Sequence, residues 1–159
     1  MVKKFSIPWE LKYKYVKGML TTLFKGFLYE IREEFGAATA LKIYEKFNKK
    51  YDRIRNMTNN IKDVFKIEGN DIEALATTFE IWFELTGWEV IWYDQSEKSI
   101  KFKCPFGCAW LTKPEDLSEW FLIIANTFAK SINPKAIIER TMGMCAGDSS
   151  CEYIIKIEE

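Results

Sequence analysis

The stretch GWEVIWYDQSEKSIKFKC, residues 87–104, decides the fold class because its apolar side chains recur at every second position. A period of two is typical of a β-strand with one buried face. The polar residues DQSEK, 94–98, interrupt the alternation near its middle. We therefore predict a β-hairpin here. The alternating apolar residues are Trp88, Val90, Trp92, Ile100, Phe102 and Cys104.

Before this hairpin the apolar residues follow the period of helices, 3.6 residues per turn. One helix is expected over residues 8–36 and a second over residues 37–54. The connection RNMTNNIKDVFKIEGN, residues 55–70, is polar, and we expect at most one short helical turn in it. Asn70 and Glu73 have the spacing of a capping box, which predicts the start of a third helix.

The segments after the hairpin complete the predicted sheet. Pro114 is placed to start a fourth helix, and residues 136–157 alternate as two strands around a loop at 146–150. Helices followed by strands indicate an α+β fold. We predict a single domain, residues 1–159, in which N-terminal helices pack on a four-stranded antiparallel sheet, with one helix inserted after the second strand.

The composition excludes several classes of protein. Apolar residues make up 48% of the chain and aromatic residues 16%, which is too apolar for a disordered protein. No apolar run reaches the roughly 18 residues of a membrane span, and the N-terminus lacks a signal-peptide pattern. We expect a cytoplasmic protein, in which thiols stay reduced. Abundant Lys, Glu and Ile give a hyperthermophile-like composition, and hyperthermophiles are an exception that keeps intracellular disulfides.

The charges divide unevenly along the chain although its net charge is zero. Residues 1–66 carry 15 Lys and Arg against 7 Asp and Glu, and residues 67–159 carry the remaining 8 against 16. Either the two regions face each other in one protomer, or two protomers dock head to tail. Gly18 and Gly26, in the first predicted helix, suggest that another backbone approaches it closely. We expect residues 1–66 to be a basic helical dimerisation region of a homodimer.

A nucleic-acid partner is not expected. The basic stretch KIYEKFNKKYDRIR, residues 42–55, is confined to one predicted helix. Binding to phosphates needs a broader positive surface.

The four cysteines form two pairs in the sequence. Cys104 and Cys108 are separated by three residues, which lies within the spacing of zinc sites. Cys145 and Cys151 flank a polar loop, and if they oppose each other across two strands they could hold a metal or form a disulfide. Simple burial is a further explanation for Cys104. Because the chain has no histidine, Cys–His and Ser–His–Asp catalysis are excluded, whereas a thiolate activated by Arg140 stays open.

The segment GDSSCEY, residues 147–153, resembles the closing signature of the 4-vinyl reductase domain family. Gly147, Asp148, Cys151 and Tyr153 match that signature. The longer tail ERTMGMCAGDSSCEY is similar to the related aminothiazoline-carboxylate hydrolase-like group. The resemblance implies the fold of transport-protein-particle subunits and haem-NO-binding-like sensors. It also implies a small, often aromatic ligand near a zinc held by cysteines and an acid.

The resemblance transfers only some of the family's zinc ligands. Cys151 matches the last ligand, but the preceding one falls at Gly143, two residues from Cys145. The family's acid falls near Glu139, and Glu119 stands nearest to its cysteine at the start of the inserted helix. We therefore predict that cysteines from both pairs hold the zinc. The predicted ligands are Cys104, Cys108, Cys145 and Cys151, with Glu139 and Glu119 as alternatives.

From this resemblance we expect a non-catalytic, small-molecule-binding sensor domain that contains zinc and binds an apolar or aromatic molecule. The same aromatic residues could instead be filled core. Two other functions stay open: an enzyme of the vinyl reductase or aminothiazoline-carboxylate hydrolase type, and a protein–protein interaction module. The predicted pocket residues are Phe79, Trp82, Trp92, Phe102, Trp120 and Phe121.

Overall fold

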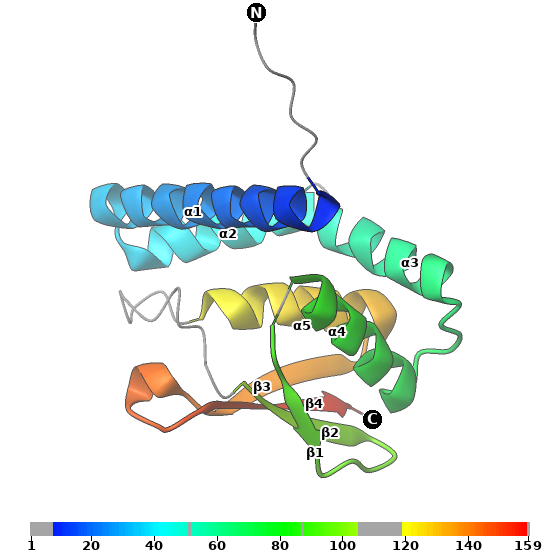
Figure 1. The fold of residues 1–159 in the computed structure, drawn as a ribbon. Coiled ribbons are helices and arrows are strands. Elements are labelled where there is room, and N and C mark those ends of the chain that lie inside the picture. Colours follow the sequence, from blue (N-terminus) through cyan, green and yellow to red (C-terminus); the bar gives the residue numbers. More distant parts are fainter. Residues whose placement is uncertain (1–7, 51, 87, 105–118, 159) are drawn as a thin grey trace, which may run out of the picture. The chain divides into compact units, whose positions relative to one another are not determined.

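The protein has an α+β fold in which helices precede a four-stranded antiparallel sheet, as the sequence predicts (Figure 1). The computed structural model describes residues 8–50, 52–86, 88–104 and 119–158. Within these ranges, no helix is both long enough and apolar enough to cross a membrane.

The chain divides into two compact units, residues 1–40 and 41–159. The boundary falls inside a helix, well before the change of charge at residue 66. The first unit contains α1, Trp9–Phe35, which ends where Gly36 takes the left-handed φ of 82°. Side chains other than glycine rarely adopt this conformation, so Gly36 fixes the end of the predicted first helix.

The second predicted helix is shorter than expected and the polar connection is mostly helical. Here α2 spans Ala37–Lys50 and α3 spans Arg53–Phe65, with Asp52 at a left-handed φ of 48° between them. The prediction of a connection with at most one turn was therefore wrong. Ile54, Thr58 and Ile61 stand at helical spacing and are all buried. The Thr58 hydroxyl donates to the Ile54 carbonyl at 2.8 Å, so a residue that reads as polar fits the buried face.

The third predicted helix is α4, Ile72–Thr86. Asp71 is its cap, because the Asp71 Oδ1 atom accepts a hydrogen bond from the Ala74 amide at 2.9 Å. The predicted cap, Asn70, is one residue too early, and its carbonyl instead accepts from the Asn133 side chain at 2.8 Å. Next comes α5, Trp120–Ile132; its predicted start at Pro114 lies outside the described residues.

The sheet has the strand order β1-β2-β4-β3, and every neighbouring pair is antiparallel. The last strand of the chain is therefore central, between β2 and β3. The final loop covers residues 143–150 and contains a 3₁₀ turn, so it is longer than the predicted 146–150. The strands are β1, Ile91–Tyr93; β2, Ser99–Cys104; β3, Ala136–Met142; and β4, Cys151–Ile157.

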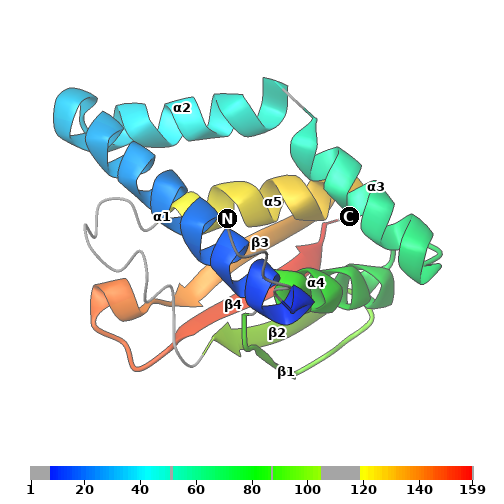
Figure 2. The ribbon, with the colours of Figure 1, turned by 45° about the horizontal axis from the view of Figure 1, so that its top comes forward.

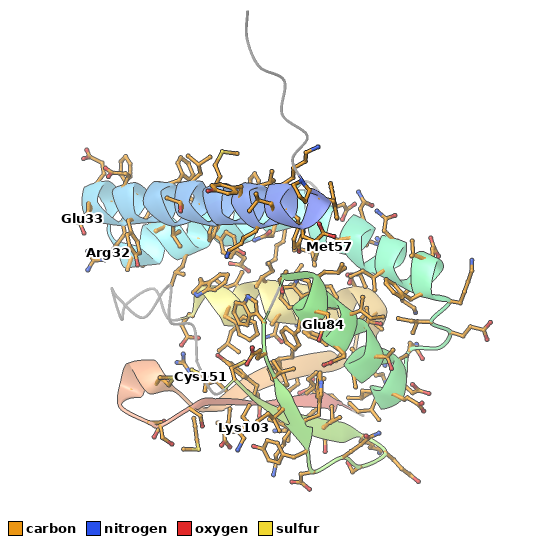
Figure 3. The ribbon with its side chains drawn as sticks, in the orientation of Figure 1. Arg32, Glu33, Met57, Glu84, Lys103 and Cys151 are labelled. Carbon is orange, nitrogen blue, oxygen red and sulfur yellow. The ribbon has the colours of Figure 1, made fainter. Side chains whose placement is uncertain are left out.

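Both α4 and α5 cover the same face of the sheet, and no helix of the described residues lies on the other face of β2 and β4 (Figures 1 and 2). The predicted alternation is visible in β2, where every second residue is buried. Lys103 points to the uncovered face (Figure 3). The sheet residues buried on the covered face are Ile100, Phe102, Cys104, Ala136, Ile138, Cys151, Tyr153 and Ile155.

Candidate functional site

Aromatic rings from α4, α5 and the sheet meet in the layer between the helices and the sheet. Helical spacing places Phe79, Trp82 and Phe83 toward the sheet, and the strand alternation turns Phe102 and Tyr153 toward the helices. We call this group the aromatic cluster. Its members are Phe79, Trp82, Phe83, Trp88, Trp92, Phe102, Trp120, Phe121, Phe128 and Tyr153.

The rings of the aromatic cluster pack directly on one another. Trp82 stacks on Phe128 with 4.7 Å between ring centroids, and Phe121 lies 4.8 Å from Tyr153. Phe83 connects the helical and sheet parts, since its ring is 5.7 Å from Phe79 and 5.3 Å from Phe102. These distances are those of favourable aromatic pairs. The cluster is thus a continuous apolar layer.

All six predicted pocket residues belong to the aromatic cluster, so the structure brings them together. Sequence reasoning missed four members. Phe83 and Phe128 are neighbours of the chosen residues on α4 and α5. Tyr153 had been noted only as part of the cysteine signature, although it alternates with Ile155 as a core residue should. Trp88 had been assigned to the strand alternation.

Trp88 differs from the other members because it lies on the connection between α4 and β1. Its ring stacks on Phe121 with 5.1 Å between centroids and 20° between planes, and meets Trp120 edge-on at 6.2 Å. The Trp88 amide donates to the Phe83 carbonyl at 2.9 Å. Trp88 is only half-buried. It therefore forms the rim of the aromatic cluster.

Polar partners fix two aromatic residues of β1. The Trp92 indole donates to the Glu80 carboxylate at 2.5 Å, which ties the strand to α4. The Tyr93 hydroxyl donates to Glu152 Oε2 at 2.7 Å on the uncovered face of the sheet. This hydrogen bond is the main reason that the pKa of Tyr93 rises to about 12.

A shallow groove of about 380 Å³ lies apart from the aromatic cluster, between the end of α2 and α5. Charged side chains of both signs stand on its walls, among them Glu45, Lys49 and Lys130. Glu119, at one end, accepts an ion-paired hydrogen bond from Arg140 at 2.6 Å. Leu122 and Ile123 also line the groove, but it is open to solvent, whereas a small-molecule site is usually an enclosed cleft.

Cys104 and Cys151 face each other directly across β2 and β4. Both are buried, and no disulfide joins them in this structure. Burial, with a smaller contribution from the neighbouring Cys151, raises the pKa of the Cys104 thiol to about 12. The Met144 amide donates to the Cys151 Sγ atom at 3.4 Å. The sequence had paired Cys151 with Cys145, but the strand opposite Cys151 is β2.

The other predicted zinc ligands are placed as follows. Cys108 lies outside the described residues, and Cys145 lies in the 3₁₀ turn, with its side chain outside the description. Glu139 pairs with Lys156 on the face of the sheet opposite to Cys151. Among the side chains that the structure describes, no three of Cys, Asp or Glu gather closely enough to hold a metal ion.

The four residues that match the GDSSCEY signature each have a local structural role. Gly147 takes a left-handed φ of 98° at the end of the 3₁₀ turn. Asp148 Oδ2 accepts from the Gly143 amide at 2.7 Å and closes the loop. Cys151 then opens β4, and Tyr153 enters the aromatic cluster, where its ring lies 5.1 Å from Phe102. The signature therefore forms the end of the loop and the start of β4, whose buried residues belong to the core.

Comparisons with known proteins find solved structures with a similar fold, but no protein family that matches the sequence. No family model matches the chain, and no curated protein matches it in sequence. One similar structure is trafficking protein particle complex subunit 3 from Naegleria fowleri, covalently bound to palmitic acid. It superposes with a TM-score of 0.68 at 10% identity, covering 92% of this chain and 97% of that one.

Another is the phenol-responsive sensory domain of the transcription activator PoxR, determined with phenol. Its TM-score is 0.63 at 9% identity, over 86% of this chain and 74% of that one. The likeness to a trafficking-particle subunit is the fold that the signature implied. At such low identity these matches show a shared fold alone.

Proposed function

We propose that this protein is a non-catalytic, small-molecule-binding domain of the 4-vinyl reductase type, and that its aromatic cluster receives an apolar or aromatic ligand. The observation that carries the proposal is the layer of ten aromatic rings between α4, α5 and the sheet. Two proteins with this fold bind apolar molecules, palmitic acid in one and phenol in the other. A ligand surrounded by such rings would be recognised by stacking and by apolar burial.

Because the rings already touch, a ligand has to take the place of a side chain. Trp88 is the member of the aromatic cluster whose displacement by a ligand should cost the least free energy. It stands on a connection, is half-buried, and belongs to neither α4 nor β1. A planar ligand in its place would stack on Phe121 and meet the edge of Trp120, as the Trp88 indole does.

The test is to remove the Trp88 ring and offer small aromatic molecules in its place. Trp88→Ala leaves a space of about the size of an indole, and apolar cavities of this kind bind aromatic molecules. We expect Trp88→Ala to bind indole and phenol at least tenfold more tightly than the unaltered chain, measured by calorimetry. Palmitate is the third probe. Trp9→Ala is the control, because Trp9 is 72% exposed on α1.

If neither the unaltered chain nor Trp88→Ala binds any of the three probes, the proposed ligand site is wrong. Trp88→Phe separates this outcome from misfolding, since it keeps a ring on Phe121 and should retain the melting temperature.

We also propose that the cysteines bind zinc. Two ligands of a tetrahedral site would be Cys104 and Cys151, which share a rung and a face of the sheet. A structural zinc takes four ligands, so Cys108 and Cys145 would supply the others. Zinc and thiols should be quantified on one sample, native and then denatured with chelator. We expect about one zinc per chain and thiols that react only after denaturation. Cys151→Ser with unchanged zinc content would refute this site.

A further inference from the structure

We propose that Cys104 and Cys151 are the two halves of a reversible cross-strand disulfide, formed when the chain meets a two-electron oxidant such as a peroxide. The inference goes beyond ligand binding, and it concerns a pair that the sequence did not join. Both residues lie at the end of their strands, Cys104 as the last residue of β2 and Cys151 as the first of β4.

The register of the sheet sets the distance between the two residues. The Ile157 amide donates to the Lys98 carbonyl at 2.9 Å, one rung beyond the paired residues Ser99 and Lys156. In an antiparallel ladder each rung is a pair of directly opposite residues. Rungs whose two residues hydrogen-bond to each other alternate with rungs whose residues do not. Counting from Lys98 and Ile157, the rung of Cys104 and Cys151 is a hydrogen-bonded one. Its Cα atoms are then about 5.5 Å apart, near the commonest value for disulfides.

Side-chain direction also favours the bond. Residues that share a rung point to the same face, and here both thiols are buried on the face covered by α4 and α5. In a hydrogen-bonded rung the Cβ atoms lie about 5.5 Å apart, so they must approach by about 1–2 Å to reach disulfide geometry. Among the described residues, this rung is the last pair of the β2–β4 ladder.

The reaction balances with hydrogen peroxide as the oxidant. The thiolate of Cys151 attacks one peroxide oxygen, which breaks the O–O bond, gives a sulfenic acid and releases water after proton uptake. The Met144 amide donates a hydrogen bond to this sulfur at 3.4 Å. The Cys104 sulfur then attacks the sulfenic sulfur, its proton leaves with the expelled hydroxide as a second water, and the S–S bond forms. Two thiols lose two electrons and peroxide gains them.

The disulfide would join β2 covalently to β4 beside the aromatic cluster. The next buried rung on the same face is Phe102 with Tyr153, both members of the cluster. The disulfide would also close a loop that contains α5 and β3, which stabilises the fold by restricting the unfolded chain. Oxidation and zinc binding exclude each other, because both use the same sulfur atoms.

A pair of double variants tests the proposal. Cys108→Ser/Cys145→Ser keeps only Cys104 and Cys151, and the matched control Cys104→Ser/Cys151→Ser keeps only the other two. Each is treated with chelator and then with hydrogen peroxide in its native state, at mildly alkaline pH. Thiols are counted after denaturation, and linked peptides are identified by mass spectrometry without reduction.

We expect the first variant to lose both thiols, to yield a peptide joined through Cys104 and Cys151, and to melt several degrees higher when oxidised. A dithiol reductant should restore both thiols and the lower melting temperature. The proposal is overturned if the first variant keeps two thiols, or if its thiols become sulfinic acids without a link. It is also overturned if the unaltered chain links Cys104 to Cys108 or Cys145 to Cys151 instead.

Discussion

Cys104 shows how one buried side chain makes the whole chain sensitive to alkali. Burial and the neighbouring Cys151 raise the pKa of its thiol from an ordinary 9.0 to about 12. The folded state therefore holds this proton at pH values where the unfolded state loses it. The stabilisation is complete below pH 9 and is lost as the pH rises toward 12.

We predict that, in the chain freed of zinc by a chelator, the free energy of unfolding falls between pH 9 and pH 10, by on the order of 1 kcal/mol through Cys104 alone. In Cys104→Ala the fall should begin nearer pH 10, where Tyr44 and Tyr93, whose pKa values also rise to about 12, begin to contribute. The measurement is urea denaturation at half-unit steps of pH. Because the substitution also leaves a cavity, the slopes are compared and not the absolute stabilities. Equal slopes for both chains from pH 9 to 10 would contradict the prediction.

Thr58 shows that the polarity of a residue does not by itself predict whether it is exposed or buried. It is fully buried, and its hydroxyl both donates to the Ile54 carbonyl and accepts from the Ser131 hydroxyl at 2.7 Å. Satisfied in this way, a hydroxyl can be buried without the cost of a lost hydrogen bond. The sequence shows Thr58 but not Ser131 beside it, since the two are far apart along the chain.

At the scale of elements, α1 carries an exposed apolar stripe. Trp9, Tyr13, Val16, Leu23 and Phe27 are all exposed, and their spacing follows the alternating steps of four and three residues typical of helix pairing. Leu20 occupies the remaining position of this pattern. Exposed apolar patches of this extent mark interaction surfaces. The stripe supports the proposal that a second copy of the chain pairs with α1.

We predict a homodimer at micromolar concentration, which Leu23→Asp converts to monomer by placing a charge in the stripe. The control is Leu11→Asp, the same change on the opposite side of α1 at a residue that is 44% exposed. Light scattering after size exclusion, at moderate salt, measures the mass of each. A monomeric unaltered chain, or equal effects of the two substitutions, would count against pairing through this stripe.

The two glycines of α1, Gly18 and Gly26, suggested from the sequence that another backbone approaches this helix. Apart from the adjoining backbone of α1 itself, no described atom lies within 4 Å of a Cβ placed on Gly18 or Gly26. Neither glycine belongs to the apolar stripe.

At the scale of the molecule, the strand order decides which residues meet. Because β4 lies between β2 and β3, the last seven-residue strand of the chain forms the centre of the sheet. This position puts Tyr153 beside Phe102 and Cys151 beside Cys104. The two structures with the same fold share only 10% and 9% identity with this chain, so the arrangement depends on the pattern of buried positions more than on particular residues.

The sequence by itself determined the elements whose period is strong. The alternation around DQSEK predicted the β1–β2 hairpin, Gly36 predicted the end of α1, and GDSSCEY indicated the final turn and the fold class. These signals are local, because each depends on residues within one or two turns of chain. The six aromatic residues chosen from the sequence lie together in the aromatic cluster, since side chains on the apolar faces of helices and strands are buried together.

Only the tertiary structure decided which residues from distant segments of the chain lie next to each other. The sequence groups cysteines by their separation along the chain, whereas the sheet pairs Cys104 with Cys151, residues separated by α5 and β3. It also made α3 a helix, because burial of Ile54, Thr58 and Ile61 against other elements outweighs a polar composition. Contacts between distant segments depend on strand order and register, and neither is encoded in the spacing of any one segment.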